Sequence, residues 1–171
     1  IPPYASDYNR NTLPWRVKKE IAGAGYFYDL ASHQLDLLDF LFGSIANASG
    51  HTFNAAGLYE VEDTVSATFK FQSGILGSGS WCFVAPSNTR TDTIELVGTK
   101  GKLSFSTFMF TDIVLETSDG KIFFNENNPD NIQYYLIKSI VEYLQGKDVE
   151  VTSTSASAAR TNWVMDKIIY G

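Results

Sequence analysis

A histidine and two aspartates, Asp29, His33 and Asp36, lie at helical spacing in the first quarter of the chain. An α-helix turns about 100° per residue, so these side chains share one face of a helix. Residues four apart on a helix are neighbours, and a carboxylate beside an imidazole can orient the ring. Histidine has an unperturbed pKa of about 6.5 and exchanges protons near neutral pH. The Asp29–His33 pair can therefore abstract a hydroxyl proton and hydrogen-bond a polyol.

Two other interpretations of the same three residues stay open. The polar face of an amphipathic helix is normally solvated, and aspartates in a first turn interact favourably with the helix dipole. A metal site is also conceivable, but the spacing matches no specific ligand motif, so we assign no metal.

The elements that position these residues follow from periodicity. Prolines disfavour helix in residues 1–22, and a helix is predicted from about Tyr26 to Phe42, with Gly43 as its C-cap. Alternation from about His51 to Phe124 predicts strands near 64–71, 75–83, 92–97, 102–106, 112–117 and 121–124, the last two joined by an Asp119-Gly120 hairpin. Helical periodicity returns at about Asp130–Leu144 and from Ser153–Ser155 to about Tyr170.

This order of one helix, a run of antiparallel strands and two helices predicts an α+β fold, with an open-faced sheet and helices packed on one face. We expect the helices to cover the face that carries Val65, Ala67, Phe69 and Phe71. The opposite face, which carries Thr64, Ser66, Thr68 and Lys70, should meet water or a partner.

Composition excludes several classes of function. The net charge of −6 argues against nucleic acid as a partner, and no apolar run is long enough to span a membrane. Cys82 is the one cysteine, which excludes a disulfide framework and agrees with a cytoplasmic protein; we expect a buried, inert thiol. The N-terminus lacks the features of a signal peptide and is interpreted as a cut inside a longer protein.

The segment Gly23–Asp36 resembles the signature GGGxxxDxxxHxxD of the C-terminal domain in the glucose–fructose oxidoreductase/inositol dehydrogenase (Gfo/Idh/MocA) family. Ala24 replaces the middle glycine. Three further segments, in the expected order, are also similar to members of that family: Leu13–Val17, Ile94–Leu103 and Val164–Tyr170.

The resemblance implies that residues 1–171 form a single C-terminal domain for substrate binding and oligomerisation. In this family an N-terminal Rossmann domain binds NAD or NADP. The chain contains neither a GxGxxG fingerprint after a strand nor the family's Glu-Lys-Pro motif. We therefore expect the nucleotide domain to lie outside this chain, and the isolated chain to be inactive.

The resemblance also assigns roles to residues. His33 would be the proton acceptor or donor for a sugar or polyol hydroxyl, and Asp29 would support it and contact the substrate. Asp36 is a further candidate for substrate binding. Trp15 and Arg16 precede the helix and can reach a pocket, although a packed tryptophan and a surface ion pair explain them equally well. Among the aromatic residues near the start of the helix predicted at about Asp130–Leu144, we select Tyr134 as pocket-lining.

These assignments predict an NAD(P)-dependent oxidoreductase acting on a sugar, a polyol or a related hydroxyl compound. Two alternatives remain: a non-catalytic carbohydrate-binding or oligomerisation module with the same fold, and an NAD-dependent glycoside hydrolase. We also expect a homo-oligomer that forms through the open face of the sheet.

Overall fold

The structure, a computed structural model, describes residues 3–126 and 128–171 and divides the chain into two compact units. The first unit comprises the described residues up to Arg90 together with Ser153–Gly171, and the second comprises Thr91–Thr152. The sheets of both units are antiparallel, and helices accompany them, so the predicted α+β class is confirmed.

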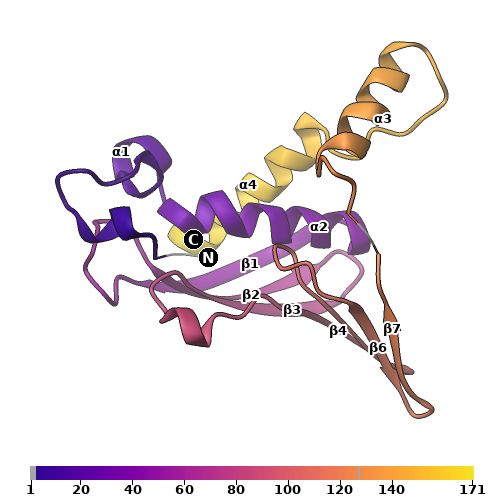
Figure 1. Cartoon of the computed structure of the whole chain (residues 1–171), viewed down its shortest axis with the longest axis horizontal. Helices are drawn as coiled ribbons and strands as arrows, with labels where there is room; N and C mark the ends of the chain where they lie inside the picture. Colours follow the sequence, from indigo (N-terminus) through magenta and orange to yellow (C-terminus); the bar gives the residue numbers. More distant parts are fainter. Residues whose placement is uncertain (1–2, 127) are drawn as a thin grey trace. The chain divides into compact units, whose positions relative to one another are not determined.

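The first unit is built on a three-stranded sheet with the order β1-β2-β3. These strands are β1 (Ile45–Phe53), β2 (Thr64–Phe71) and β3 (Leu76–Cys82). Strand β2 has the predicted bounds, whereas β1 begins before the predicted start of the strand region at His51. Figure 1 shows helices α2 (Ser32–Phe42) and α4 (Ser155–Tyr170) on one side of this sheet.

The shorter elements of this unit precede α2 or follow β3. They are the 3₁₀ turns η1 (Ala5–Tyr8), η2 (Trp15–Val17) and η4 (Ser87–Thr89), the short helix α1 (Lys19–Ala22) and the π-helical turn η3 (Phe27–Ala31). Gly43 ends α2 with a positive φ of 79°, as predicted, and its N–H donates to the carbonyl of Asp39.

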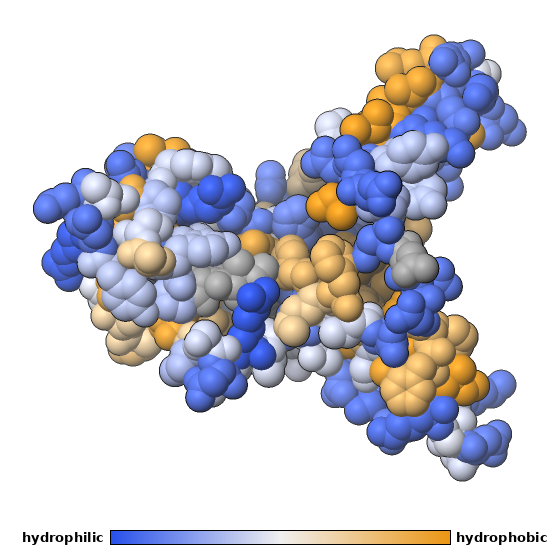
Figure 2. Space-filling model, in the orientation of Figure 1, coloured by the Kyte–Doolittle hydropathy of each residue, from blue (hydrophilic) through white to orange (hydrophobic). Residues whose placement is uncertain are grey.

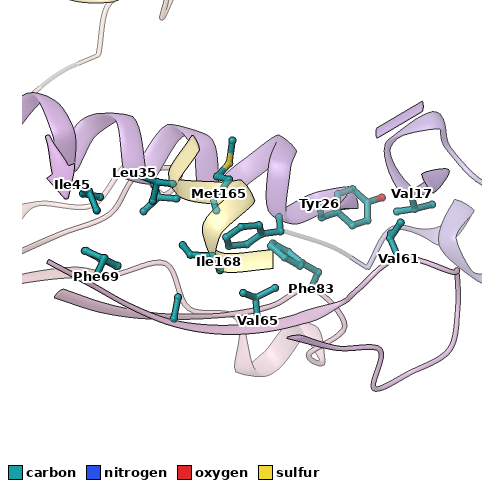
Figure 3. Close-up of a cluster of buried hydrophobic side chains, with 14 of the residues drawn as sticks. Val17, Tyr26, Leu35, Ile45, Val61, Val65, Phe69, Phe83, Met165 and Ile168 are labelled. Carbon is teal, nitrogen blue, oxygen red and sulfur yellow. The ribbon is translucent and has the colours of Figure 1, made fainter. Parts of the chain in front are cut away.

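The hydrophobic core lies between the sheet and these helices (Figure 3). Val65, Ala67, Phe69 and Phe71 of β2 are all buried on the side facing the helices, which confirms the predicted inner face. The helices contribute further buried residues: Phe27, Ala31, Leu35, Val164, Met165 and Ile168. Val17, Tyr26 and Val61 extend the core toward the N-terminal segment.

Helix α4 approaches β1 closely at Gly50. A Cβ added there would lie 2.7 Å from Ile168 Cγ2 and 2.8 Å from the Ile168 carbonyl oxygen. The absence of a side chain at Gly50 thus allows the helix to pack directly against the strand.

We therefore expect Gly50→Ala to destabilise the protein by about 1–3 kcal/mol, the usual cost of overpacking a core. Urea denaturation measures the change. Gly98→Ala is the control, because a Cβ there would meet only the Gly101 carbonyl oxygen, at 3.8 Å. Equal stability of the Gly50 variant and the wild type would contradict the close approach.

The opposite face of this sheet is exposed. Ser66, Thr68 and Lys70 of β2 point to this side, and β1 adds His51 beside Ser66. Cys82 also lies here and is exposed, so the prediction of a buried thiol is wrong. The reason is strand pairing, since Cys82 lies opposite Thr64 and therefore shares its outward face.

The second unit contains a four-stranded antiparallel sheet and helix α3 (Tyr134–Leu144). Its strands are β4 (Ile94–Gly98), β5 (Gly101–Phe105), β6 (Ile113–Thr117) and β7 (Gly120–Phe124). Thr117 pairs with Gly120, which confirms the predicted hairpin. Among its described residues none is buried, and Figure 2 shows apolar residues exposed along α3.

The described residues, 3–126 and 128–171, include no helix that combines the length and apolar character needed to cross a lipid bilayer.

Candidate functional site

The helix that carries Asp29 and His33 is not a regular α-helix. Residues Phe27–Ala31 form a π-helical turn, and α-helical geometry begins at Ser32. A π-turn has i→i+5 hydrogen bonds and includes an extra residue, so it rotates Asp29 relative to α2. The expectation of a uniform turn of about 100° per residue is therefore wrong here. Single π-turns inside helices occur frequently at functional sites.

The glycine-rich segment before this turn has a definite packing role. Gly23 and Gly25 have φ values of 62° and 60°, a region that favours glycine. A Cβ at Gly25 would lie only 2.5 Å from Val61 Cγ2. Ala24 is fully buried and has no positive φ, so a methyl group is tolerated at this position. The departure from the glycine signature at Ala24 is thus structurally neutral.

Three of the predicted site residues are in contact: Trp15, Arg16 and Asp29, the last of which belongs to the π-turn. Arg16 Nε donates to Asp29 Oδ2 at 2.8 Å, and both side chains are partly exposed. The Arg16 guanidinium also stacks on Trp15, with Cζ 4.6 Å from the ring centroid. Trp15 is 51% exposed, so its ring is available for stacking against a ligand. The cluster offers a cation, a carboxylate and an aromatic surface.

His33 lies in the first turn of α2, four residues after Asp29, and is exposed. Its placement leaves the imidazole accessible to a small molecule. His51, the second histidine of the chain, lies on the exposed face of the sheet of the same unit. His33 is therefore the histidine on the same helical segment as Asp29 of the cluster.

Asp36 does not join that cluster. Its Oδ1 accepts a hydrogen bond from Thr161 Oγ1 of α4 at 3.1 Å. One turn later, Asp39 is buried and accepts from both Nε and Nη2 of Arg160, at 3.1 and 2.6 Å. The hydrogen bonds to this carboxylate raise the pKa of Arg160. Part of the polar face of α2 thus binds α4, while the substrate-binding role of Asp36 stays a prediction.

Tyr134 lies in the second unit, at the start of α3. It is exposed, and its ring contacts that of Tyr135 edge-on, with centroids 5.2 Å apart. Its predicted role in lining a pocket stays a prediction. No group of three or more His, Cys, Asp or Glu side chains that could hold a metal ion occurs in the part of the chain that the structure describes.

A contact absent from the sequence analysis holds the helical segment to the sheet. Trp81 Nε1 of β3 donates to Gln34 Oε1 of α2 at 2.6 Å, and the Trp81 ring packs edge-on against Phe27, with centroids 5.2 Å apart. Gln34 is the polar exception on the apolar side of the predicted helix. A polar residue among apolar ones is a sequence signal for a partly buried hydrogen bond of this kind.

Residues 4–104 match the model of the GFO/IDH/MocA C-terminal domain. This chain belongs to the Gfo/Idh/MocA family. It is 31% identical to Oxidoreductase P35 of Formosa agariphila over 158 residues, which cover 92% of this chain and 47% of the relative. It is 28% identical to the levoglucosan dehydrogenase of Pseudarthrobacter phenanthrenivorans over 60% of this chain and 32% of the relative.

Solved structures of the family share the fold. A levoglucosan dehydrogenase in complex with NADH and levoglucosan matches with a TM-score of 0.74 at 19% identity, covering 97% of this chain and 53% of that one. An Agrobacterium radiobacter oxidoreductase in complex with NAD+, L-tartaric acid and magnesium also has a TM-score of 0.74, at 16% identity, with 95% and 51% covered. This Gfo/Idh/MocA chain thus spans about half the length of Oxidoreductase P35 and of the two solved chains, and its match covers about a third of the Pseudarthrobacter enzyme.

Proposed function

We propose that this chain is the substrate-binding and catalytic domain of an NAD(P)-dependent oxidoreductase that acts on a sugar, a polyol or a related hydroxyl compound. The observation that carries the proposal is the partly exposed Trp15–Arg16–Asp29 cluster, followed one turn later by the exposed His33. Relatives in the same family are oxidoreductases, and one of them is a levoglucosan dehydrogenase.

In this proposal each residue of the site has a distinct task. The exposed face of Trp15 stacks against the apolar side of a sugar ring. A guanidinium has five N–H donors, and Asp29 accepts from the Nε–H of Arg16. The other N–H groups of Arg16 donate hydrogen bonds to substrate hydroxyl groups. His33 accepts the proton of the hydroxyl group that is oxidised, and Asp29 orients the substrate and favours the imidazolium that forms.

The described residues of this chain do not form a binding site for NAD or NADP. A dinucleotide site requires a parallel βαβ unit with a glycine-rich turn, and both sheets formed by the described residues are antiparallel. NAD or NADP, which would supply the hydride acceptor, is therefore assigned in this proposal to a second domain outside the 171 residues. The cytoplasmic location expected from the sequence is part of the same proposal.

The turnover of a panel of sugars and polyols with NAD+ or NADP+ tests this function, using the protein in which this chain is joined to its nucleotide-binding domain. Formation of reduced nicotinamide with an oxidised sugar supports the oxidoreductase. Binding of sugars without turnover would favour a carbohydrate-binding module instead. Release of a sugar from a glycoside without net reduction of the nucleotide would indicate glycoside cleavage.

We also propose that the exposed face of the β1–β3 sheet binds a second copy of the chain. Hydroxyl side chains dominate its centre, and Phe53 and Leu76 are 68% and 76% exposed at its ends. Sedimentation of the protein is expected to show self-association that Thr68→Arg weakens, because the added charge would be buried in the interface. A strict monomer at high concentration would contradict this part of the proposal.

A further inference from the structure

The π-turn that carries Asp29 is held by different partners at three successive residues. Phe27 is fully buried and packs against Trp81 of the sheet. Asp29 accepts the hydrogen bond from Arg16. Between them, the Tyr28 hydroxyl donates a hydrogen bond to Asp166 Oδ1 of α4. The Tyr28 contact has no role in the proposed function.

Gly23, five residues before Tyr28, leaves the space that the Tyr28 ring occupies. A Cβ at Gly23 would lie 3.2 Å from Cε2 of the Tyr28 ring, so glycine at this position leaves room for the ring. The hydroxyl group is thereby directed to a residue 138 positions later in the chain. Burial and then the hydrogen bond to Asp166 raise the pKa of Tyr28, which keeps its phenol protonated as a donor.

Asp166 lies on a part of α4 that packs against the sheet and is hydrogen-bonded to α2. Its neighbours Met165 and Ile168 are buried in the core, and Ile168 packs against Gly50 of β1. Hydrogen bonds from Thr161 to Asp36 and from Arg160 to Asp39 tie the same helix to α2. The backbone of α4 that carries the exposed Asp166 side chain is therefore fixed relative to the sheet.

We propose that Tyr28 and Asp166 are positioning residues that hold the π-turn, and with it the Asp29 carboxylate, in the orientation that meets Arg16. This inference rests on the proposed function for the role of Asp29. A π-turn is an uncommon backbone geometry, so it persists only where its side chains are fixed from outside. A displacement of about 1 Å in a catalytic group can cost a factor of about 10² in rate, which makes such fixing consequential.

The Arg16 Nε–H group reports the orientation of Asp29 directly, because it donates to Asp29 Oδ2. Its NMR signal and its exchange with solvent can be followed without any substrate. Tyr28→Phe and Asp166→Ala, which both remove the hydrogen bond, are expected to accelerate this exchange about tenfold, as more frequent opening of the Arg16–Asp29 contact predicts. Asp166→Asn, which retains a carbonyl acceptor, should largely restore the wild-type rate.

Tyr26→Phe is the matched control. It removes a hydroxyl group two residues before Tyr28 that donates to the buried Asp7, in the N-terminal segment, at 2.9 Å. Tyr26→Phe is expected to lower the melting temperature while leaving the Arg16 Nε–H exchange close to that of the wild type. The control thus distinguishes a variant that is only less stable from one in which Asp29 has lost its orientation.

Turnover with the nucleotide-binding domain attached provides the second readout. Tyr28→Phe is expected to lower kcat about tenfold, with KM for the nucleotide unchanged, and the double variant with Asp166→Ala should add little further loss. Unchanged Arg16 Nε–H exchange in both variants would overturn the positioning role, whatever the activity. A wild-type protein that oxidises no hydroxyl compound would instead overturn the proposed function, and accelerated exchange would still support the structural linkage.

Discussion

Turnover by the His33→Ala protein is expected to fall by a factor of about 10²–10⁴, the usual contribution of a positioned general acid or base. His33 is exposed in the first turn of α2, and its side chain is not among the buried residues of the core. The substitution should therefore remove proton transfer without unfolding the domain. Steady-state kinetics with the nucleotide-binding domain attached measures the loss, which should appear in kcat more than in KM.

His51→Ala is the control for this experiment. His51 is also exposed, but it lies on the open face of the sheet, opposite Ser66. Its removal is expected to leave kcat within about twofold of the wild type, since it lies on the opposite face of the sheet from α2, which carries His33. Equal activities of the two histidine variants would mean that His33 transfers no proton.

Gly25→Ala is expected to produce the largest loss of stability among the substitutions in the glycine-rich segment, about 2–5 kcal/mol. A left-handed φ costs a non-glycine residue about 1–2 kcal/mol. The added Cβ would also lie 2.5 Å from Val61 Cγ2 in the buried core, and overpacking of this kind costs about 1–3 kcal/mol. Urea denaturation should show a lower midpoint with an unchanged slope.

The neighbouring substitution Ala24→Gly is the comparison. Ala24 has no positive φ, so the change relieves no strain and removes only a buried methyl group. We expect a loss of about 1 kcal/mol, from the entropy of glycine and the lost burial. If Ala24→Gly destabilised the protein more than Gly25→Ala, the account of the glycine motif would be wrong.

The sequence predicted those parts of the fold where one local pattern dominates. The alternation over Thr64–Phe71 defined β2 and its buried face, and Asp119-Gly120 defined a hairpin. Strand β1 was largely missed, because Asn47 and Gly50 have low strand propensity. The strand forms because β2 pairs along its whole length and α4 packs on Gly50, and both partners are distant in sequence.

The sequence supplied the candidate residues of the site but not their arrangement. The proximity of Arg16 to Asp29 depends on the backbone turns at Gly23 and Gly25 and on a π-turn, which follows from tertiary packing and not from helical periodicity. The hydrogen bond between Asp36 and Thr161 joins residues 125 positions apart, so no local pattern could indicate it. Long-range contacts of this kind decide which carboxylates of the helix are bound by α4.

The proposal that His33 accepts the substrate proton is tested most directly by measuring turnover of the His33→Ala protein with increasing concentrations of free imidazole. An imidazole in solution can replace the missing side chain where a proton must be removed in an accessible site. We predict that imidazole raises the turnover of His33→Ala in a saturable manner and leaves the wild type unchanged. Turnover of His33→Ala at the wild-type rate in the absence of imidazole would contradict the proposed role.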